Sequence, residues 1–355
     1  MKILTDFCGG NADIISVEPD RVRFLPEIRD SMEDWFYWAF EVRGAAGQTV
    51  TFDMSPKRYV GYFGAAVSHD LEHWEWTHSA LPDRSGFTYT FASDEDRVYF
   101  AHDMLYHPSQ FHKFAELHGL RVRTLTADNK GTPIPYVRVG EGERTIILTA
   151  RHHCCEATGD YIMEGIIDEY LRSPLEGCSI LAIPFIDADG VVAGDQGKNR
   201  NPHDHNRDYL DEPLYNGVRA VQSLMRSERV LAVFDLHSPW HIGGRNDKVF
   251  IVRKLSEELE SMKRFGKCLE AEITPGAMKY DSANDIDPGV DWNKGGPHIS
   301  CGSYCGDFEG VELSFTLETT YFGEPGNIVS QDRLVETGRC FMRAINRYFG
   351  GRAPM

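Results

Sequence analysis

The sequence predicts an α/β domain with a mixed, mostly parallel sheet, preceded by a small all-β antiparallel sandwich. Between residues 35 and 100, short runs rich in aromatic and β-branched residues alternate with turn-forming residues, which is typical of a sandwich. After Pro108, strand-like and helix-like segments alternate to the end, which indicates a largely parallel sheet covered by helices. A chain of 355 residues is long enough for two units. We expect a sandwich domain over residues 1–110 and an α/β domain over 111–355.

The expected elements follow this division. Strands of the sandwich are expected at 35–42, 49–54, 59–67, 74–77, 87–91 and 97–100, with turns at 44–47, 55–56 and 93–96. In the second part, Ser109 is placed to cap a helix that ends at Leu117. Further strands are expected at 145–149, 179–185, 230–236, 249–252 and 311–317, and helices at 161–171, 214–226, 255–269 and 334–348. Ligands collect at the carboxyl ends of parallel strands, so functional residues are expected there.

The composition limits which binding partners and which cellular compartment are expected. The net charge of -17 opposes binding to nucleic acid or to an anionic membrane surface. No segment reaches the roughly 18 apolar residues of a membrane span, and the first ten residues do not form a signal sequence. Eight cysteines, two of them adjacent at 154 and 155, do not form the disulfide framework of a small secreted domain. We expect a cytoplasmic protein whose oligomeric state the sequence leaves open.

A histidine and a glutamate follow the strand expected at 145–149. His153 and Glu156 are three residues apart, a spacing that can aim an imidazole and a carboxylate at one metal ion. His69 and Glu72 have the same spacing inside the expected sandwich. The pair alone is therefore weak evidence and also fits a surface or helix-cap contact.

A further histidine, His237, ends the strand expected at 230–236. A single histidine at this place is commonly a hydrogen-bonded core residue. Two histidines and one glutamate at the ends of different strands, however, match the ligand set of a catalytic zinc site, which leaves one coordination position open for water. Zinc lowers the pKa of that water to about 7. We expect one zinc ion as cofactor.

A hydrolytic zinc site also needs a general acid/base, and Glu318 is the candidate. Glu318 follows the strand expected at 311–317, in which apolar residues alternate with polar ones on the face that Glu318 shares. The alternative is a solvated edge of the sheet.

A polar segment at 197–209 lies between the ligand-bearing segments. A solvated loop is the simplest interpretation, yet Arg200 and Arg207 carry planar forks suited to a carboxylate, and Asn206 can donate beside them. A pocket of this kind beside zinc would select a peptide or protein tail with a free carboxylate.

Together these segments resemble the zinc carboxypeptidase family typified by carboxypeptidase A, and within it the cytosolic carboxypeptidase branch. Residues 150–158 resemble the block Arg-x-His-Pro-Gly-Glu that holds two ligands, and 235–238 resemble the block of the third ligand. The other matching segments are 187–190 with the Asn-Pro-Asp-Gly turn, 205–207 with the carboxylate-binding element, 315–318 with the general-base block, and 35–38 with the Trp-Phe-Tyr-Phe strand of the sandwich. The resemblance covers most of the chain, in family order.

The resemblance implies a metallocarboxypeptidase with His153, Glu156 and His237 as metal ligands. It implies hydrolysis of a C-terminal or side-chain isopeptide bond by Glu318-assisted attack of zinc-bound water. Further implied roles are polarisation of the scissile carbonyl by Arg200, carboxylate binding by Asn206 and Arg207, and a mobile tyrosine, for which Tyr304 is the nearest candidate. Cytosolic relatives remove glutamates from protein tails, a preference that this sequence does not establish.

The chain departs from the family pattern at several positions. Cys154 and Cys155 replace Pro-Gly between the first two ligands, which could place a thiol near zinc, and His152 could compete as a ligand. The interval from Arg200 to Asn206 is shorter than in the family. In addition, Cys301 and Cys305 are either a second metal pair or unpaired structural thiols.

Two other functions remain open at this point. One is hydrolysis of small N-acyl amino acids, as in the aspartoacylase and succinylglutamate desuccinylase relatives, against which the N-terminal sandwich argues. The other is a non-catalytic binding protein on the same scaffold, against which Glu318 and the complete ligand set argue.

Overall fold

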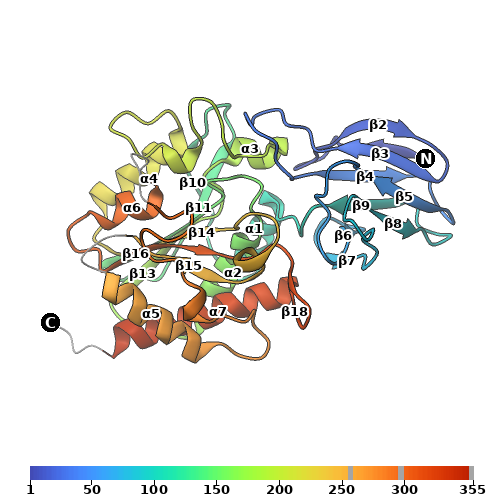
Figure 1. The fold of residues 1–355 in the computed structure, drawn as a ribbon. Helices are drawn as coiled ribbons and strands as arrows, with labels where there is room; N and C mark the ends of the chain where they lie inside the picture. Colours follow the sequence, from blue (N-terminus) through green and yellow to red (C-terminus); the bar gives the residue numbers. More distant parts are fainter. Residues whose placement is uncertain (255–258, 295–299, 352–355) are drawn as a thin grey trace.

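Residues 1–254, 259–294 and 300–351 are described by a computed structural model, in which an all-β N-terminal part adjoins a larger α/β part (Figure 1). The N-terminal part contains a five-stranded sheet, in the order β1-β4-β9-β6-β7, and a four-stranded sheet, in the order β2-β3-β5-β8. The strands are β1 (Lys2–Leu4), β2 (Asp13–Val17), β3 (Arg21–Leu25), β4 (Ala39–Arg43), β5 (Thr49–Asp53), β6 (Ala66–Ser68), β7 (Glu75–Trp76), β8 (Gly86–Thr90) and β9 (Arg97–Ala101).

An aromatic core holds the two N-terminal sheets together. Phe40 of β4 packs 5.4 Å from Phe52 of β5, and Phe52 packs 4.8 Å from Phe87 of β8, as measured between ring centroids. Successive side chains of a strand point to opposite faces of its sheet, so these rings lie on the face of each sheet that is turned toward the other sheet. On β4 the neighbouring residue Ala39 joins the core shared with the α/β part. The strands β4 and β9 of the five-stranded sheet are therefore buried on both faces over most of their length.

The expected sandwich differs from the structure in three respects. It is not wholly antiparallel, because β3 and β5 pair in parallel, and this pairing is possible because the intervening β4 lies in the other sheet. The strands expected at 35–42 and 59–67 are shorter, and within the first of them the aromatic residues 35–37 pack into the core shared with the α/β part instead of pairing. In addition, the strands β1, β2 and β3 were not expected from the sequence.

The α/β part contains a seven-stranded mixed sheet in the order β10-β11-β13-β12-β14-β16-β15. Its central strands β13, β12, β14 and β16 pair in parallel, whereas both edges pair antiparallel. The expected mixed sheet is confirmed. The strands are β10 (Arg123–Ala127), β11 (Pro133–Val139), β12 (Arg144–Ala150), β13 (Cys178–Ile183), β14 (Val230–His237), β15 (Phe250–Val252) and β16 (Leu313–Glu318), and a separate hairpin is formed by β17 (Gly323–Glu324) and β18 (Asn327–Ile328).

Helices cover both faces of this sheet, with α2, α5 and α7 on one side and α4 and α6 on the other (Figure 1). The α-helices are α1 (Pro108–Leu117), α2 (Thr158–Arg172), α3 (Ala188–Ala193), α4 (Asn216–Ser227), α5 (Leu259–Glu272), α6 (Cys301–Gly306) and α7 (Gln331–Gly350). The first four residues of the helix expected at 255–269 lie outside the described residues. Helix α1 is capped by His107 and Gln110 and not by Ser109, because Pro108 takes the first helical position, where a missing N–H leaves no hydrogen bond unmade.

Helices α2 and α7 pack closely against each other at a contact formed by glycines. A Cβ atom on Gly165 would lie 1.9 Å from the carbonyl oxygen of Val335, so a larger residue does not fit there. Among the described residues, no helix is both long and apolar enough to cross a membrane.

Candidate metal centre and active site

His153, Glu156 and His237 meet at the carboxyl ends of neighbouring parallel strands. The loop after β12 carries His153 and Glu156, and His237 is the last residue of β14, which pairs with β12. Glu156 lies 2.9 Å from His153 (Oε1 to Nδ1) and 2.7 Å from His237 (Oε2 to Nδ1). All three residues are at most 2% exposed. We refer to them as the trio.

The donor atoms of the trio fit a divalent cation. The two Nδ1 atoms are only 3.1 Å apart, and one ligand atom from each residue lies within 4.8 Å of the others. Two imidazoles and a carboxylate are the donor set of catalytic zinc sites, which keep one position open. Burial by itself would raise the pKa of Glu156, but the facing His153, Lys198 and His237 hold that pKa well below its usual value. The carboxylate is therefore ionised and ready to bind a cation.

Asp235 orients the second imidazole of the trio. Its Oδ2 lies 2.7 Å from Nε2 of His237, and its Oδ1 accepts a hydrogen bond from Thr149 at 2.8 Å. A carboxylate behind a ligand imidazole fixes the ring and raises its basicity, as in many metal sites. Burial disfavours the charged imidazole, but Asp235 and Glu156 raise the pKa of His237 well above its usual value.

His152 supports the centre from behind. Its Nδ1 lies 2.8 Å from Oδ1 of Asp235, and its Nε2 lies 2.7 Å from the hydroxyl of Tyr209. Both ring nitrogens of His152 thus face protein groups, as do those of His237. Ligand atoms of His152, Asp235 and His237 also lie within 4.8 Å of one another, so the alternative in which His152 competes with its neighbour stays a prediction.

Glu318 lies beside the trio, one strand further along the sheet. Strands β14 and β16 are parallel, and Glu318 occupies the register position of His237. Its carboxylate is buried, and Oε2 has no hydrogen-bond partner. Burial raises the pKa of Glu318 to about 7, with Glu156 adding to the rise and His237 opposing it. A carboxyl group with this pKa can both accept and return a proton near neutral pH.

Asn206 also reaches the centre, within the single 3₁₀ turn His205–Arg207. Its Nδ2 lies 3.3 Å from Nε2 of His237, and its Oδ1 accepts a hydrogen bond from the backbone N–H of Cys301 at 2.9 Å. The next residue, Arg207, is partly exposed and donates to the carbonyl oxygen of Asn206 at 3.0 Å. Most of its guanidinium remains available to a ligand.

The structure does not bring Arg200 to the trio. Its guanidinium forms ion pairs with three carboxylates, at 2.8 Å to Asp30, 2.8 Å to Asp187 and 3.3 Å to Asp195. Burial alone would lower the pKa of Arg200, but Asp187, Cys154 and Asp30 raise that pKa above its usual value. Arg200 therefore fastens the polar loop to the N-terminal part, from which Asp30 comes.

Tyr304 likewise does not contact the trio. Its hydroxyl accepts a hydrogen bond from Arg226 at 3.2 Å, and its ring packs 5.4 Å from that of Tyr209. The side chain lies on α6, one turn after the residue that binds Asn206. Tyr304 is thus separated from the centre by the residues that support it.

The cysteines at the two ambiguous positions act as buried thiols. Cys154 donates to the carbonyl oxygen of Asp195 at 3.1 Å, and Cys155 lies 3.9 Å from the hydroxyl of Tyr321. Cys301 and Cys305 are 3.9 Å apart between their sulfurs and form no disulfide. Burial raises the pKa of Cys154, Cys155 and Cys301, which keeps these thiols protonated. None of the four belongs to a metal-binding cluster among the described residues.

Sequence reasoning missed Lys198, Asp204 and Trp35. The ammonium of Lys198 lies 3.4 Å from Oε1 of Glu156 and 5.7 Å from the ring centroid of Trp35. Asp204 places Oδ1 3.5 Å from Nε2 of His153. Lys198 and Asp204 belong to the polar segment 197–209, where nothing in the sequence distinguishes them from solvated loop residues.

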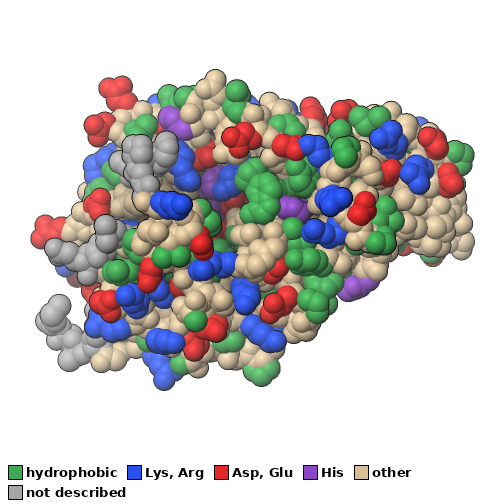
Figure 2. Space-filling model, in the orientation of Figure 1, with side chains coloured by type: hydrophobic (Ala, Val, Ile, Leu, Met, Phe, Trp, Pro, Cys, Tyr) green, Lys and Arg blue, Asp and Glu red, His purple; other side chains and the backbone are tan. Residues whose placement is uncertain are grey.

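Figure 2 shows histidine side chains in a hollow near the middle of the molecular face that it draws, with hydrophobic side chains beside the hollow.

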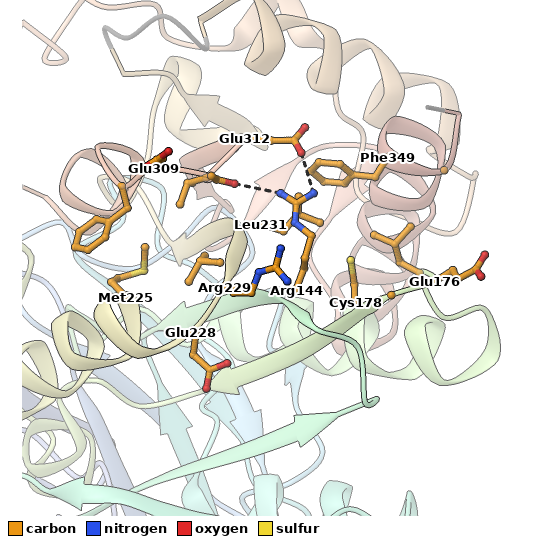
Figure 3. Close-up of a pocket in the computed structure, with 17 residues that line it drawn as sticks. Arg144, Glu176, Cys178, Met225, Glu228, Arg229, Leu231, Glu309, Glu312 and Phe349 are labelled. Atoms are coloured by element: carbon orange, nitrogen blue, oxygen red, sulfur yellow. Dashed lines mark hydrogen bonds and ion pairs between the residues drawn. The ribbon is translucent and has the colours of Figure 1, made fainter. Parts of the chain in front are cut away.

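A large cavity of about 1160 Å³ lies away from this centre (Figure 3). Its lining comes from the amino ends of the parallel strands, including Arg144 and Val230, and from the last turn of α7. Inside it, Arg144 donates to Glu312 at 3.0 Å and also to the carbonyl oxygen of Gly310. Because the trio lies at the carboxyl ends, this cavity belongs to the opposite edge of the sheet.

Comparison with known proteins supports the resemblance to the zinc carboxypeptidases. No family model matches the chain. Two curated relatives are an uncharacterized protein of Zymomonas mobilis, 26% identical over 67% of this chain and 67% of that protein, and cytosolic carboxypeptidase 2 of Xenopus tropicalis, 25% identical over 72% of this chain. The aligned region spans only 29% of the length of the Xenopus protein.

Several solved structures match nearly the whole chain. A metallo-carboxypeptidase from Burkholderia cenocepacia is 18% identical with a TM-score of 0.82, covering 99% of this chain and 100% of that one. A metallo-carboxypeptidase from Pseudomonas aeruginosa, in complex with (2-guanidinoethylmercapto)succinic acid, is 22% identical with a TM-score of 0.79, covering 97% and 98%. At these identities the likeness establishes the fold. The resemblance to the zinc carboxypeptidases, in their cytosolic branch, is thus confirmed by relatives and by fold.

Proposed function

We propose that this protein is a zinc-dependent metallocarboxypeptidase that hydrolyses a peptide bond, C-terminal or side-chain linked, next to a free carboxylate. The observation that carries the proposal is the buried trio with Glu318 in register beside it. His153, Glu156 and His237 would hold the ion. When bound, zinc would act as a Lewis acid and lower the pKa of a water molecule.

The protein's own residues account for the proton transfers. Glu318 has a buried carboxylate oxygen without a partner, and its pKa of about 7 suits a group that removes a proton from water. The same carboxyl then delivers the proton to the leaving amine. Hydrolysis is complete when the carbonyl carbon has exchanged its bond to nitrogen for a bond to the water oxygen.

Asn206 and Arg207 would bind the substrate carboxylate. Asn206 is held in place by the N–H of Cys301, and Arg207 offers guanidinium donors that suit a bidentate contact. The succinic acid derivative in the Pseudomonas aeruginosa complex is itself a carboxylate ligand of a similar fold, which supports this assignment. The eight cysteines are all free, which supports a reducing compartment such as the cytoplasm.

A substrate panel tests the proposal. Protein purified without chelator is assayed for bound metal and for hydrolysis of dipeptides, polyglutamate tails, γ-glutamyl peptides and acylated amino acids. We expect one zinc ion per chain and activity on at least one peptide class that carries a free carboxylate. Activity on the acylated amino acids alone would replace the proposal with N-acyl amino acid hydrolysis, and inactivity of the zinc-loaded protein on every class would leave a binding protein.

A further inference from the structure

Lys198 is held with its ammonium at the edge of the trio. Its Nζ lies 3.4 Å from Oε1 of Glu156, and its side chain is 22% exposed. On its other side, the ring of Trp35 lies 5.7 Å from Nζ, within the range of a cation–π contact. Trp35 comes from the N-terminal part, and its ring stacks on Phe36 at 4.9 Å. These contacts restrict a side chain that is otherwise flexible.

The charge of Lys198 acts on the acidic groups around the centre. Its ion-pair partner there is Glu156, at 3.4 Å between Nζ and Oε1, a carboxylate that would also hold the metal ion. Arg200, by contrast, is paired with three carboxylates outside the trio. Once Glu156 shares its charge with a bound ion, the ammonium of Lys198 is left to interact with a substrate at the edge of the trio.

We propose that Lys198 is a catalytic residue that stabilises the negative charge developing on the scissile carbonyl oxygen. This inference rests on the proposed function and deepens it, because it assigns to Lys198 the role that the family resemblance gives to Arg200. As the water oxygen bonds to the carbonyl carbon, the π electron pair of the carbonyl moves onto its oxygen, which then carries a full charge. An ammonium donor at this oxygen is worth far more in a buried site than in water.

The remaining steps balance with groups already described. The water proton passes to Glu318, the electron pair returns to the carbonyl, the bond to nitrogen breaks, and Glu318 protonates the amine that leaves. Lys198 takes part in none of these proton transfers. The second proton of the water also passes to the amine, so the products are a carboxylate and an ammonium group.

Three variants and one control test the inference in the metal-loaded protein. Lys198→Met removes the ammonium, Lys198→Arg restores a cation of different shape, and Arg200→Lys keeps a charge at the position expected from the resemblance. Lys267→Met is the control, since Lys267 is exposed on α5 and pairs with Glu270. For Lys198→Met we expect kcat to fall about 100-fold or more, with KM and the zinc content unchanged. Lys198→Arg should recover part of this loss, and Arg200→Lys should lower kcat less than Lys198→Met does. Lys267→Met should retain kcat within about threefold.

Ligand binding gives a second readout that does not depend on turnover. A phosphonate analogue of the preferred substrate carries anionic oxygens where the carbonyl oxygen would become charged, whereas the amino acid product lacks them. Calorimetry on the zinc-loaded Lys198→Met variant should show the phosphonate weakened by about 30-fold or more and the product unchanged. We expect both ligands to bind the Lys267→Met variant as they bind the wild type.

The outcomes separate this inference from the proposed function. Wild-type protein that hydrolyses none of the peptide classes overturns both. If the wild type is active and the Lys198→Met variant is unimpaired, the role of Lys198 alone is overturned. The same holds if the Lys198→Met variant loses activity only because it loses zinc. The role of Lys198 is likewise overturned if Arg200→Lys, and not Lys198→Met, loses the phosphonate.

Discussion

His237 and Glu318 occupy the same register position on the parallel strands β14 and β16. Each is the last residue of its strand, so their side chains emerge from the sheet at one edge. This relationship places the proposed acid/base next to a proposed metal ligand without any contribution from a flexible loop. Rigid strand ends are well suited to catalytic groups, because they hold the required geometry with little loss of entropy on substrate binding.

Replacing Glu318 by Gln should strongly lower turnover while preserving the metal site. The amide has nearly the same shape but cannot accept the water proton, and general acid–base catalysis contributes about 10²- to 10⁴-fold. We expect kcat to fall within this range, with zinc content and Tm at or above the wild-type values. The control is Glu309→Gln, at an exposed position shortly before β16. Full activity in the Glu318 variant would remove the mechanism.

Replacing Asp235 by Asn should weaken metal binding without removing a ligand. Asp235 lies 2.7 Å from His237 and 2.8 Å from His152, so the variant loses the charge that orients both rings. Loss of such a supporting carboxylate typically lowers metal affinity by about 10- to 100-fold. Zinc titration against a competing chelator measures the effect. An unchanged affinity would mean that the trio is oriented by other contacts.

Replacing Arg207 by Ala should raise KM far more than it lowers kcat. The proposed contact to the substrate carboxylate exists before and during the reaction, and a charged hydrogen bond contributes about 1.5 to 3 kcal/mol. This corresponds to an increase in KM of about 10- to 100-fold. Arg121→Ala, at an exposed position before β10, is the matched control. If the variant also fails to discriminate free from amidated C-termini, the assignment of Arg207 to the substrate carboxylate is strengthened. A variant that keeps this discrimination and has a normal KM would contradict the assignment.

Asp103 should make the stability of the protein depend on pH. Its side chain is fully buried, neither carboxylate oxygen has a hydrogen-bond partner, and burial raises its pKa from 3.8 to about 8, against the opposing charge of Arg151. Because the folded pKa lies above the unfolded one, the folded protein binds the extra proton between these values. The free energy of unfolding therefore falls as the pH rises from about 4 to about 8.

The Asp103→Asn variant tests this dependence directly. It cannot titrate, so its free energy of unfolding should decrease less between pH 5 and pH 8, by at least about 1 kcal/mol relative to the wild type. Denaturant unfolding at both pH values measures the difference, with the exposed Asp94→Asn as control. Identical pH slopes in wild type and variant would show that Asp103 does not titrate in this window.

The predictability of the fold varies along the chain for local reasons. Buried strands such as β14, with its run of apolar residues, are recognisable because no polar alternation interrupts them. Strands β1 and β2 are short and have no fully buried residue, so their sequence differs little from that of a loop. Strand β3, in contrast, alternates exposed residues with the buried Val22 and Phe24, which is a strand pattern present in the sequence. The aromatic segment around Trp35 has the composition of a strand, yet its rings pack into the contact between the two parts of the chain.

Residue type and position along the chain were enough to select the candidate groups of the proposed metal site. The ends of buried strands can be recognised from local sequence, so His153, Glu156, His237 and Glu318 could be picked out from the amino-acid sequence alone. In contrast, the different surroundings of Arg200 and Lys198 in the polar loop are visible only in the folded chain. Arg200 and Lys198 are two residues apart, but one is surrounded by carboxylates from distant segments and the other faces the trio. Such a division depends on long-range contacts, because the field at a side chain is set by the charges around it in space and not by its neighbours in sequence.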